Sequence, residues 1–434
     1  MKSHQFMVAL LCLVTLVCIG CFTTFAAEKN ITLTHYKFNS RAEQVAILQQ
    51  LADEFHEQYP HITINIITGP EGPEYEDKVK VMLVGGQPPD ITEFYTSLAS
   101  SLADAGQFLD LRPYVEKDPR WREANISVPA VQGSTWTDGS LIMMPSVLGA
   151  NILAYNGDLI SQAGFAFPND MGNGWNWDAM MNMVRKVVKD EDGNGTPEVW
   201  GNMGRVTLTR ILTFMIGAGD NPFDGVYSPK SANFLKPGVV AGARFAAELL
   251  DPALGTTNYN NFINGKAGFC WIGIFPFSVE LARIRLESSQ IDFRVSPWPL
   301  GPAGNRSTVA EIRGWQIMKD SPYKDEAYEW LAFVHLNQQR SLAYANVHGW
   351  IPPSTNLQGK WLQTLEFSGI EREMVSTAIQ TTLDPGNLPT PAGPGVLEVS
   401  NAWNSGFADV YNKRTPLETF LEQMNVQAAQ LLAL

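Results

Sequence analysis

Residues 31–66 read ITLTHYKFNSRAEQVAILQQLADEFHEQYPHITINI, and this stretch decides the fold class. Apolar and polar side chains alternate over residues 31–36 and again over 62–66, which predicts two β-strands. Between them, Ser40 is followed three residues later by Glu43, the spacing of a capping box at a helix start. The apolar residues that follow fall on one helical face: Val45, Leu48, Leu51, Ala52 and Phe55. Two strands joined through a helix lie parallel, so the sequence predicts a β-α-β unit.

The same mixture of elements continues along the chain. Helical periodicity recurs over residues 75–84, 177–189, 236–250 and 325–336, and strand-like alternation over 141–144 and 152–155. Mixed strands and helices in this order are typical of α/β proteins. We therefore predict an α/β fold with mainly parallel sheets flanked by helices.

Composition restricts the class of ligand. The 434 residues include 31 Lys and Arg against 44 Asp and Glu, giving a formal net charge of -13. This balance argues against a nucleic acid or an anionic membrane surface as the main partner. The chain also holds 12 Trp, and flat aromatic faces beyond those needed for a core suit carbohydrate rings.

Signatures of enzymes and cofactors are missing from the sequence. It contains no GxSxG, no HExxH and no P-loop motif, and its six His form no ligand-spaced pair on a helix. We predict a protein without a cofactor that is not an enzyme. A carboxylate pair of the glycosidase type stays open, because its separation depends on the fold.

Residues 1–27 have the three-part pattern of an export signal, with Lys2, an apolar run over residues 6–19, and small residues after it. The run falls short of the roughly 20 residues that span a bilayer. Two cleavage sites stay open: before Cys21, which would then carry a lipid, or after Ala26. The remaining chain holds Cys270 alone, so it can form no intramolecular disulfide.

Several short motifs occur in a recognisable order. They are Val84-Gly85-Gly86-Gln87-Pro88-Pro89-Asp90-Ile91, Ala154-Tyr155-Asn156-Gly157-Asp158-Leu159, Trp175-Asn176-Trp177-Asp178, Gly314-Trp315 and Gly349-Trp350-Ile351-Pro352. In this order the chain resembles the extracellular solute-binding proteins of ABC sugar importers, the family that includes the maltose-binding protein.

The resemblance implies two α/β lobes around a ligand cleft, after a leader of residues 1–27. The first lobe would take residues 28–134 and 292–345, and the second 135–291 and 346–434. It also implies a monomer that is exported to the periplasm or lipid-anchored on the outer face of the cytoplasmic membrane. This monomer would capture a mono- to oligosaccharide by hinge closure and pass it to permease subunits. Two alternatives stay open: a secreted carbohydrate-active enzyme and a glycan-binding surface protein.

Candidate ligand contacts follow from the polar ends of the predicted strands and from the resemblance. On the first lobe they are Tyr36, Asn39, Ser40, Glu43, Glu93 and Tyr95, and on the returning segments Gly314, Trp315 and Trp350. On the second lobe they are Asn151, Trp271 and Phe275. Ser40 and Glu43 could simply cap their helix, and Tyr95 and each Trp could belong to the core.

Two positions depart from the maltose binders. Where the resemblance implies acidic residues, this chain has Gly149 and Ser97, which puts maltose itself in doubt as the ligand. Asn151 and Glu93 could supply substitute polar contacts.

One further stretch resembles part of a calcium loop. Asp190, Asp192 and Asn194 place oxygen ligands at alternate positions before Gly195, but Gly201 stands where the bidentate Glu is required. This stretch could form a calcium site or a glycine-rich turn, and we predict the turn.

Overall fold

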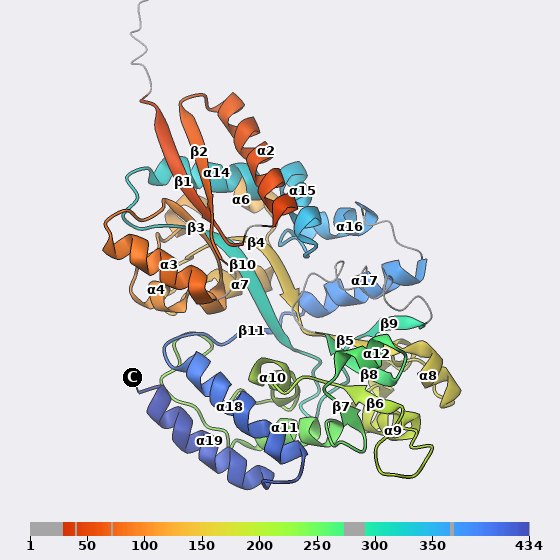
Figure 1. The fold of residues 1–434 in the computed structure, drawn as a ribbon. Helices are drawn as coiled ribbons and strands as arrows, with labels where there is room; N and C mark the ends of the chain where they lie inside the picture. Colours follow the sequence, from red (N-terminus) through yellow and green to blue (C-terminus); the bar gives the residue numbers. More distant parts are fainter. Residues whose placement is uncertain (1–28, 40, 71–72, 273–290, 365–368, 434) are drawn as a thin grey trace, which may run out of the picture.

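The computed structural model describes residues 29–39, 41–70, 73–272, 291–364 and 369–433, which form two lobes stacked end to end (Figure 1). Each lobe is built on one sheet with helices around it. Within these described ranges no helix is long and apolar enough to cross a membrane.

The first lobe surrounds a six-stranded sheet in the order β11-β10-β3-β1-β2, with β4 also paired to β10. Its strands are β1 (Ile31–Lys37), β2 (Ile62–Thr68), β3 (Ile91–Tyr95), β4 (Met144–Ala150), β10 (Val309–Ile317) and β11 (Leu388–Pro389). Its helices are α2 (Ala42–Gln58), α3 (Pro73–Val84), α4 (Ser100–Asp104), α5 (Arg112–Val115), α6 (Pro119–Ala124), α7 (Val128–Ser134), α14 (Lys324–His335), α15 (Gln338–His348) and α16 (Thr355–Thr364).

The predicted β-α-β unit is confirmed. β1 and β2 are parallel in the register Ile31↔Ile62, and α2 buries Leu48, Leu51, Ala52 and Phe55 against the sheet. Helix α2 begins one residue later than predicted, with Arg41 at the N-cap, and the predicted capping box depends on Ser40, which lies outside the described residues. Just before the helix, Asn39, in a left-handed conformation, accepts a hydrogen bond from the Arg41 N–H.

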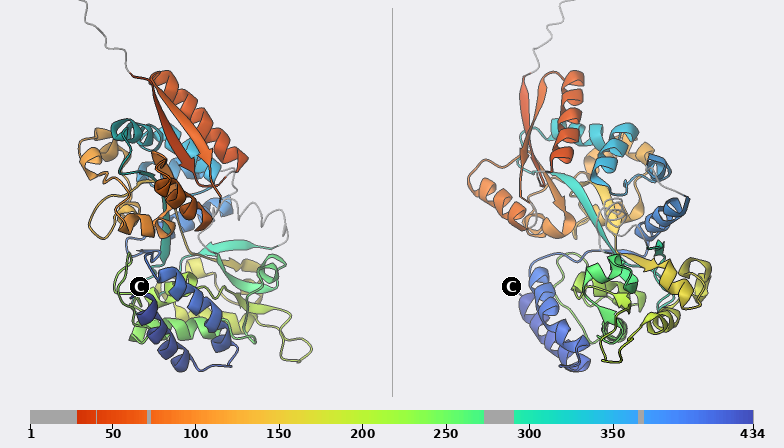
Figure 2. Two further views of the ribbon diagram at one scale, coloured as in Figure 1. Left: turned by 60° about the vertical axis from the view of Figure 1, so that its left-hand side comes forward. Right: turned by 45° about the vertical axis from the view of Figure 1, so that its right-hand side comes forward.

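The second lobe surrounds a five-stranded sheet in the order β7-β6-β8-β5-β9. Its strands are β5 (Ile152–Asn156), β6 (Trp200–Met203), β7 (Gly255–Thr256), β8 (Ala267–Ile272) and β9 (Phe293–Ser296). Its helices are α8 (Gly157–Gln162), α9 (Trp177–Val187), α10 (Leu208–Gly217), α11 (Pro237–Leu249), α12 (Tyr259–Ile263), α18 (Val396–Tyr411) and α19 (Leu417–Leu431). Two further views show α18 and α19 side by side along the outside of this lobe (Figure 2).

Both sheets are mixed rather than mainly parallel. In the first sheet β10 is antiparallel to β3 and β4, and in the second β5 is antiparallel to β8 and β9. These strands lie beside the places where the chain passes between lobes. A strand that enters a sheet from the other lobe can run against its neighbours, since no crossover helix fixes its direction.

The chain crosses between the sheets at Asn151, between β4 and β5, and again between β9 and β10. It crosses a third time between β11 and α18. The chain therefore passes between the lobes later than at the boundaries predicted after residues 134, 291 and 345. Helix α17 (Gly369–Thr382) contacts both β9 and β4, so it bridges the two lobes.

Candidate functional site

The polar residues where the two lobes meet surround Asn151, the first crossing point. The Asn151 backbone N–H donates to the Val309 carbonyl on β10 at 3.1 Å. Its buried side chain faces α10: Nδ2 donates to Thr213 Oγ1 at 3.0 Å, and Oδ1 accepts from Arg210 Nη1 at 3.0 Å. Asn151 was predicted as a ligand contact. In this structure its backbone N–H bonds to β10 of the first lobe, and its side-chain amide bonds to α10 of the second.

Glu311 lies beside this crossing and was not predicted. It is the one residue of β10 that is not buried. Its Oε1 accepts from Ser97 Oγ at 2.6 Å, and its Oε2 accepts from Thr390 Oγ1 at 3.0 Å. Burial raises the pKa of Glu311, although these hydroxyls and the charge of Arg210 lower it in part. We call Ser97, Asn151, Arg210, Glu311 and Thr390 the seam cluster.

Arg210 brings a cation to the same place from the first turn of α10. Its Nε is buried without a hydrogen-bond partner, and the described contacts give its guanidinium no carboxylate within ion-pair distance. Burial and the neighbouring charge of Arg205 lower the pKa of Arg210 to about 10. The seam cluster therefore contains a donor without a partner, Arg210 Nε, and a carboxylate, that of Glu311, which can accept further hydrogen bonds. The two groups lie within electrostatic range of each other.

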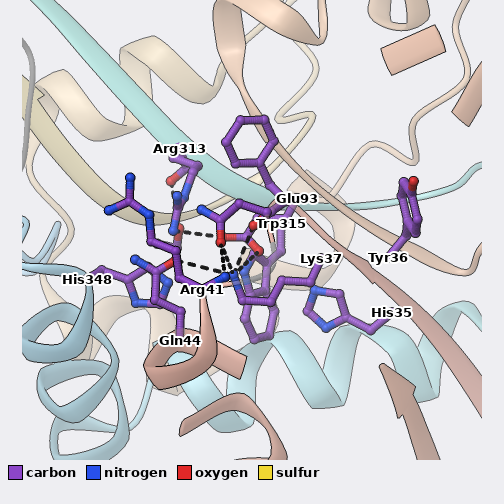
Figure 3. A network of polar contacts seen from close by, with 12 residues as sticks. His35, Tyr36, Lys37, Arg41, Gln44, Glu93, Arg313, Trp315 and His348 are labelled. Atoms are coloured by element: carbon purple, nitrogen blue, oxygen red, sulfur yellow. Dashed lines mark hydrogen bonds and ion pairs between the residues drawn. The ribbon is translucent and has the colours of Figure 1, made fainter. Parts of the chain in front are cut away.

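A second polar cluster lies deeper in the first lobe (Figure 3). Glu93 is completely buried, with Oε1 at 2.9 Å from Arg313 Nη2 and Oε2 at 3.9 Å from Lys37 Nζ. Tyr344 donates to Oε1 at 2.8 Å. We call Lys37, Glu93, Arg313 and Tyr344 the buried ion cluster.

Electrostatics in the buried ion cluster favour the charged carboxylate. Burial alone would raise the pKa of Glu93, but the charges of Arg313 and Lys37 outweigh it and lower the pKa to about 2. The Lys37 ammonium also donates to the Phe38 carbonyl at 2.9 Å and to Asn39 Oδ1 at 3.3 Å. Glu93 and Asn39 were predicted as ligand contacts. In this structure Glu93 joins β3 to β1 and β10 through Lys37 and Arg313. Asn39 instead accepts from Lys37 and from the Arg41 N–H.

The other predicted residues near this end of the sheet are mostly buried. Tyr36 is stacked on Tyr75, with ring centroids 4.8 Å apart. Tyr95 is half-buried beneath the Arg313 guanidinium, 5.6 Å from the ring centroid, and Glu43 is exposed in the first turn of α2. Ser40, Phe275 and Cys21 lie outside the described residues.

The three Trp predicted to face a ligand are only 2% (Trp271), 0% (Trp315) and 5% (Trp350) exposed. Trp315 packs inside the first lobe, stacked on Trp330 at 5.6 Å. On the adjoining Gly314, a Cβ would lie 2.6 Å from the Met144 carbonyl oxygen, so this position requires glycine for packing. None of the three indoles offers an open face in this structure, and their ligand-binding role stays a prediction.

The lobes also touch through the loop between α10 and α11. Tyr227 of this loop is stacked on Trp136 of the first lobe at 4.8 Å and donates to the Gly133 carbonyl at 2.8 Å. Its neighbour Ser228 hydrogen-bonds to Asp104, which also accepts from Trp136 Nε1 at 3.1 Å. We call this contact the interlobe latch of Asp104, Gly133, Trp136, Tyr227 and Ser228. The first-lobe half comes from the ends of α4 and α7 and the residues after α7, and the second-lobe half from a loop. Neither half was predicted from the sequence.

The loop around Asp190 brings carboxylates together on the surface. Asp190, Asp192 and Glu198 each offer an oxygen, and these oxygens lie within 4.8 Å of one another. However, the loop uses them itself: Asp190 accepts from the Gly195 N–H at 2.9 Å, and Asp192 accepts from the Asn194 side-chain amide at 2.7 Å. The carboxylates therefore accept hydrogen bonds from N–H groups of their own loop, as in a turn that is stabilised by its own side chains.

Comparison with known proteins identifies the family. The family model of the bacterial extracellular solute-binding proteins matches residues 39–340. This chain belongs to that family. A binding protein of Brucella abortus (strain 2308) is 21% identical over 420 residues, which cover 94% of each chain.

Solved structures agree with this solute-binding fold. The sugar-binding protein MalE from Xanthomonas citri superposes with a TM-score of 0.76 at 16% identity, covering 93% of this chain and 97% of that one. The ABC substrate-binding protein Lmo0181 from Listeria monocytogenes, solved with cycloalternan, gives a TM-score of 0.71 at 20% identity, covering 93% and 99%. At these identities the likeness establishes the two-lobed fold of this solute-binding protein.

Proposed function

We propose that this solute-binding protein captures a neutral carbohydrate between its lobes and delivers it to the permease of an ABC importer. The seam cluster carries this proposal. It presents hydroxyls, an amide, one carboxylate and one guanidinium where the two lobes meet, and such groups can match hydroxyls that both donate and accept hydrogen bonds. Similar structures were solved with carbohydrates, such as the cycloalternan bound to the Listeria monocytogenes protein, and they support the same class of ligand.

Binding without turnover is part of the proposal. The family consists of binding proteins, and a ligand that contacts both lobes stabilises their closed arrangement without chemistry. We expect a bound glycan to be recovered unchanged after long incubation with the purified protein. Release of a shorter product, abolished by one carboxylate substitution, would point to an enzyme instead.

The test is a ligand panel on the purified protein. Neutral mono-, di- and oligosaccharides would be titrated by calorimetry and by Trp fluorescence, with peptides and polyol phosphates as competing classes. We expect saturable binding of at least one neutral sugar. A response confined to peptides or phosphates would refute the carbohydrate assignment.

The cellular place is proposed on the same basis. We propose export to the outer side of the cytoplasmic membrane as a monomer, with Cys21 lipidation and cleavage after Ala26 as the two forms to distinguish. Mass spectrometry of the mature N-terminus in the native host decides between a diacylated Cys21 and a chain that begins at Ala27. Loss of growth on the identified sugar, when either this protein or the permease is deleted, would establish the partnership.

A further inference from the structure

Glu311 and Arg210 both lie at the seam, and a role for them in ligand binding rests on the proposed function. Along β10, the side chains of Glu311, Arg313 and Trp315 lie on one face of the strand, since alternate residues share a face. Their exposure falls in that order: Glu311 is half-buried, Arg313 is 2% exposed and Trp315 is 0% exposed. Glu311 therefore marks the point at which β10 leaves the core of the first lobe and reaches the seam.

The neighbours of Glu311 leave its carboxylate room to bond elsewhere. Glu311 is directly opposite Gly149 on β4, so the cross-strand partner brings no side chain to this face. Ser97 and Thr390 each fill one acceptor position, one on each carboxylate oxygen. A carboxylate accepts about four hydrogen bonds, which leaves positions for a ligand.

Arg210 supplies the complementary group from the other lobe. Its Nη1 is held by Asn151, while its buried Nε has no partner. The charges of Arg210 and Glu311 influence each other, yet the described contacts contain no direct ion pair between them. A buried donor left without a partner costs free energy, so this arrangement favours a group that can accept a hydrogen bond from Arg210 Nε.

We propose that Glu311 and Arg210 together bind a hydroxyl group of the carbohydrate ligand. The hydroxyl donates to the Glu311 carboxylate and accepts from Arg210 Nε, and a hydroxyl is one of the few neutral groups that can do both. Glu311 is on β10 of the first lobe and Arg210 on α10 of the second. The pair therefore selects ligands with a hydroxyl at one position and rejects the corresponding deoxy sugar, because that sugar would leave the buried Arg210 Nε without an acceptor and would bring no donor to Glu311.

The test begins with the best neutral sugar from the ligand panel. Glu311→Gln keeps the size and removes the charge, and Arg210→Lys keeps the charge and removes the planar Nε donor. We expect each variant to bind the sugar about tenfold to a hundredfold more weakly, the range for hydrogen bonds to charged groups. The matched control is Glu329→Gln, because Glu329 accepts from Tyr59 at 2.8 Å and pairs with Arg120 away from the seam. This control should bind within about twofold of the wild type.

Two further readouts separate ligand contact from a structural role. Monodeoxy analogues of the sugar should identify one hydroxyl whose loss weakens binding to the wild type but no longer to Glu311→Gln. The affinity of the wild type should also depend on pH in the acidic range, where Glu311 takes up a proton, whereas that of Glu311→Gln should not.

The outcomes distinguish the two proposals. If the wild type binds no carbohydrate, the proposed function fails and this inference fails with it. If the wild type binds a sugar and both variants bind it equally well, the hydroxyl site is refuted and the proposed function stands. A variant that melts earlier but keeps wild-type affinity and the same deoxy profile also refutes the site.

Discussion

Replacement of Arg313 by Met should destabilise the protein strongly, because it leaves the buried Glu93 carboxylate without its main counter-charge. The Arg313 guanidinium is 2.9 Å from Glu93 Oε1, whereas the Lys37 ammonium is 3.9 Å from Oε2. Removing one partner of a buried ion pair typically costs about 3–5 kcal/mol. The lowered pKa of Glu93 agrees in direction, because the charges of Arg313 and Lys37 outweigh the effect of burial on the carboxylate.

Chemical denaturation at pH 7 measures this loss. We expect Arg313→Met to lower the free energy of unfolding of the first lobe by about 3 kcal/mol or more. Arg244→Met is the matched control, because its partner Glu418 and Arg244 itself are 65% and 63% exposed. That exposed pair should contribute less than about 1 kcal/mol.

The pH dependence supplies a second check with a definite sign. The folded pKa of Glu93 lies below its unfolded value, so its contribution is present above about pH 4.5 and lost as the pH falls toward 2. The buried His35 and His335, whose pKa values burial lowers to about 4 and about 3, destabilise the fold below pH 6.5 in every variant. The difference between wild type and Glu93→Gln therefore reports Glu93 together with its effect on these two His, whose pKa values its charge raises. Equal stability of Arg313→Met and Arg244→Met, or a difference curve that is flat between pH 4.5 and 2, would refute the reasoning.

Three further predictions concern packing, closure and metal. Gly204→Ala should cost about 1–3 kcal/mol by thermal unfolding, because a Cβ there would lie 2.8 Å from the Trp271 ring; an unchanged melting temperature would show that the indole can move. Tyr227→Phe removes the hydrogen bond to the Gly133 carbonyl, which contributes about 1 kcal/mol, and should therefore weaken ligand affinity about fivefold. Small-angle scattering should also show that the ligand-free variant is more open than the wild type. Adding EDTA should leave the melting temperature within about 1 °C, since Asp190 already accepts from its own loop; a clear decrease restored by Ca²⁺ would contradict this.

Much of the fold could be predicted because its signals are local. The helices predicted over residues 75–84, 177–189, 236–250 and 325–336 correspond to α3, α9, α11 and α14, with ends that coincide or differ by one or two residues. Strand direction could not be predicted in the same way. Whether β5 and β10 run with or against their neighbours depends on how the chain passes between lobes, which no local pattern records.

Site residues were harder to predict, for a reason visible on β10. A strand that runs from the seam into a core carries the same alternation along its whole length, so the sequence does not mark where burial begins. Trp315 was chosen for its motif and lies in the core, whereas Glu311, four residues earlier, lies at the seam. The two positions at which the resemblance implies an acid, Gly149 and Ser97, both adjoin Glu311, one across the β4–β10 pairing and one through a hydrogen bond.

The position of Asn151 explains how binding at the seam can be coupled to closure. Its backbone is tied to β10, the strand that carries Glu311, and its side chain to α10, the helix that carries Arg210. A rotation of one lobe about this crossing would change the separation between the carboxylate and the guanidinium. A ligand hydroxyl bound by both groups stabilises the arrangement in which that separation fits one oxygen. A ligand that contacts only the carboxylate or only the guanidinium binds there equally well in the open and closed arrangements. Such a contact therefore does not favour closure.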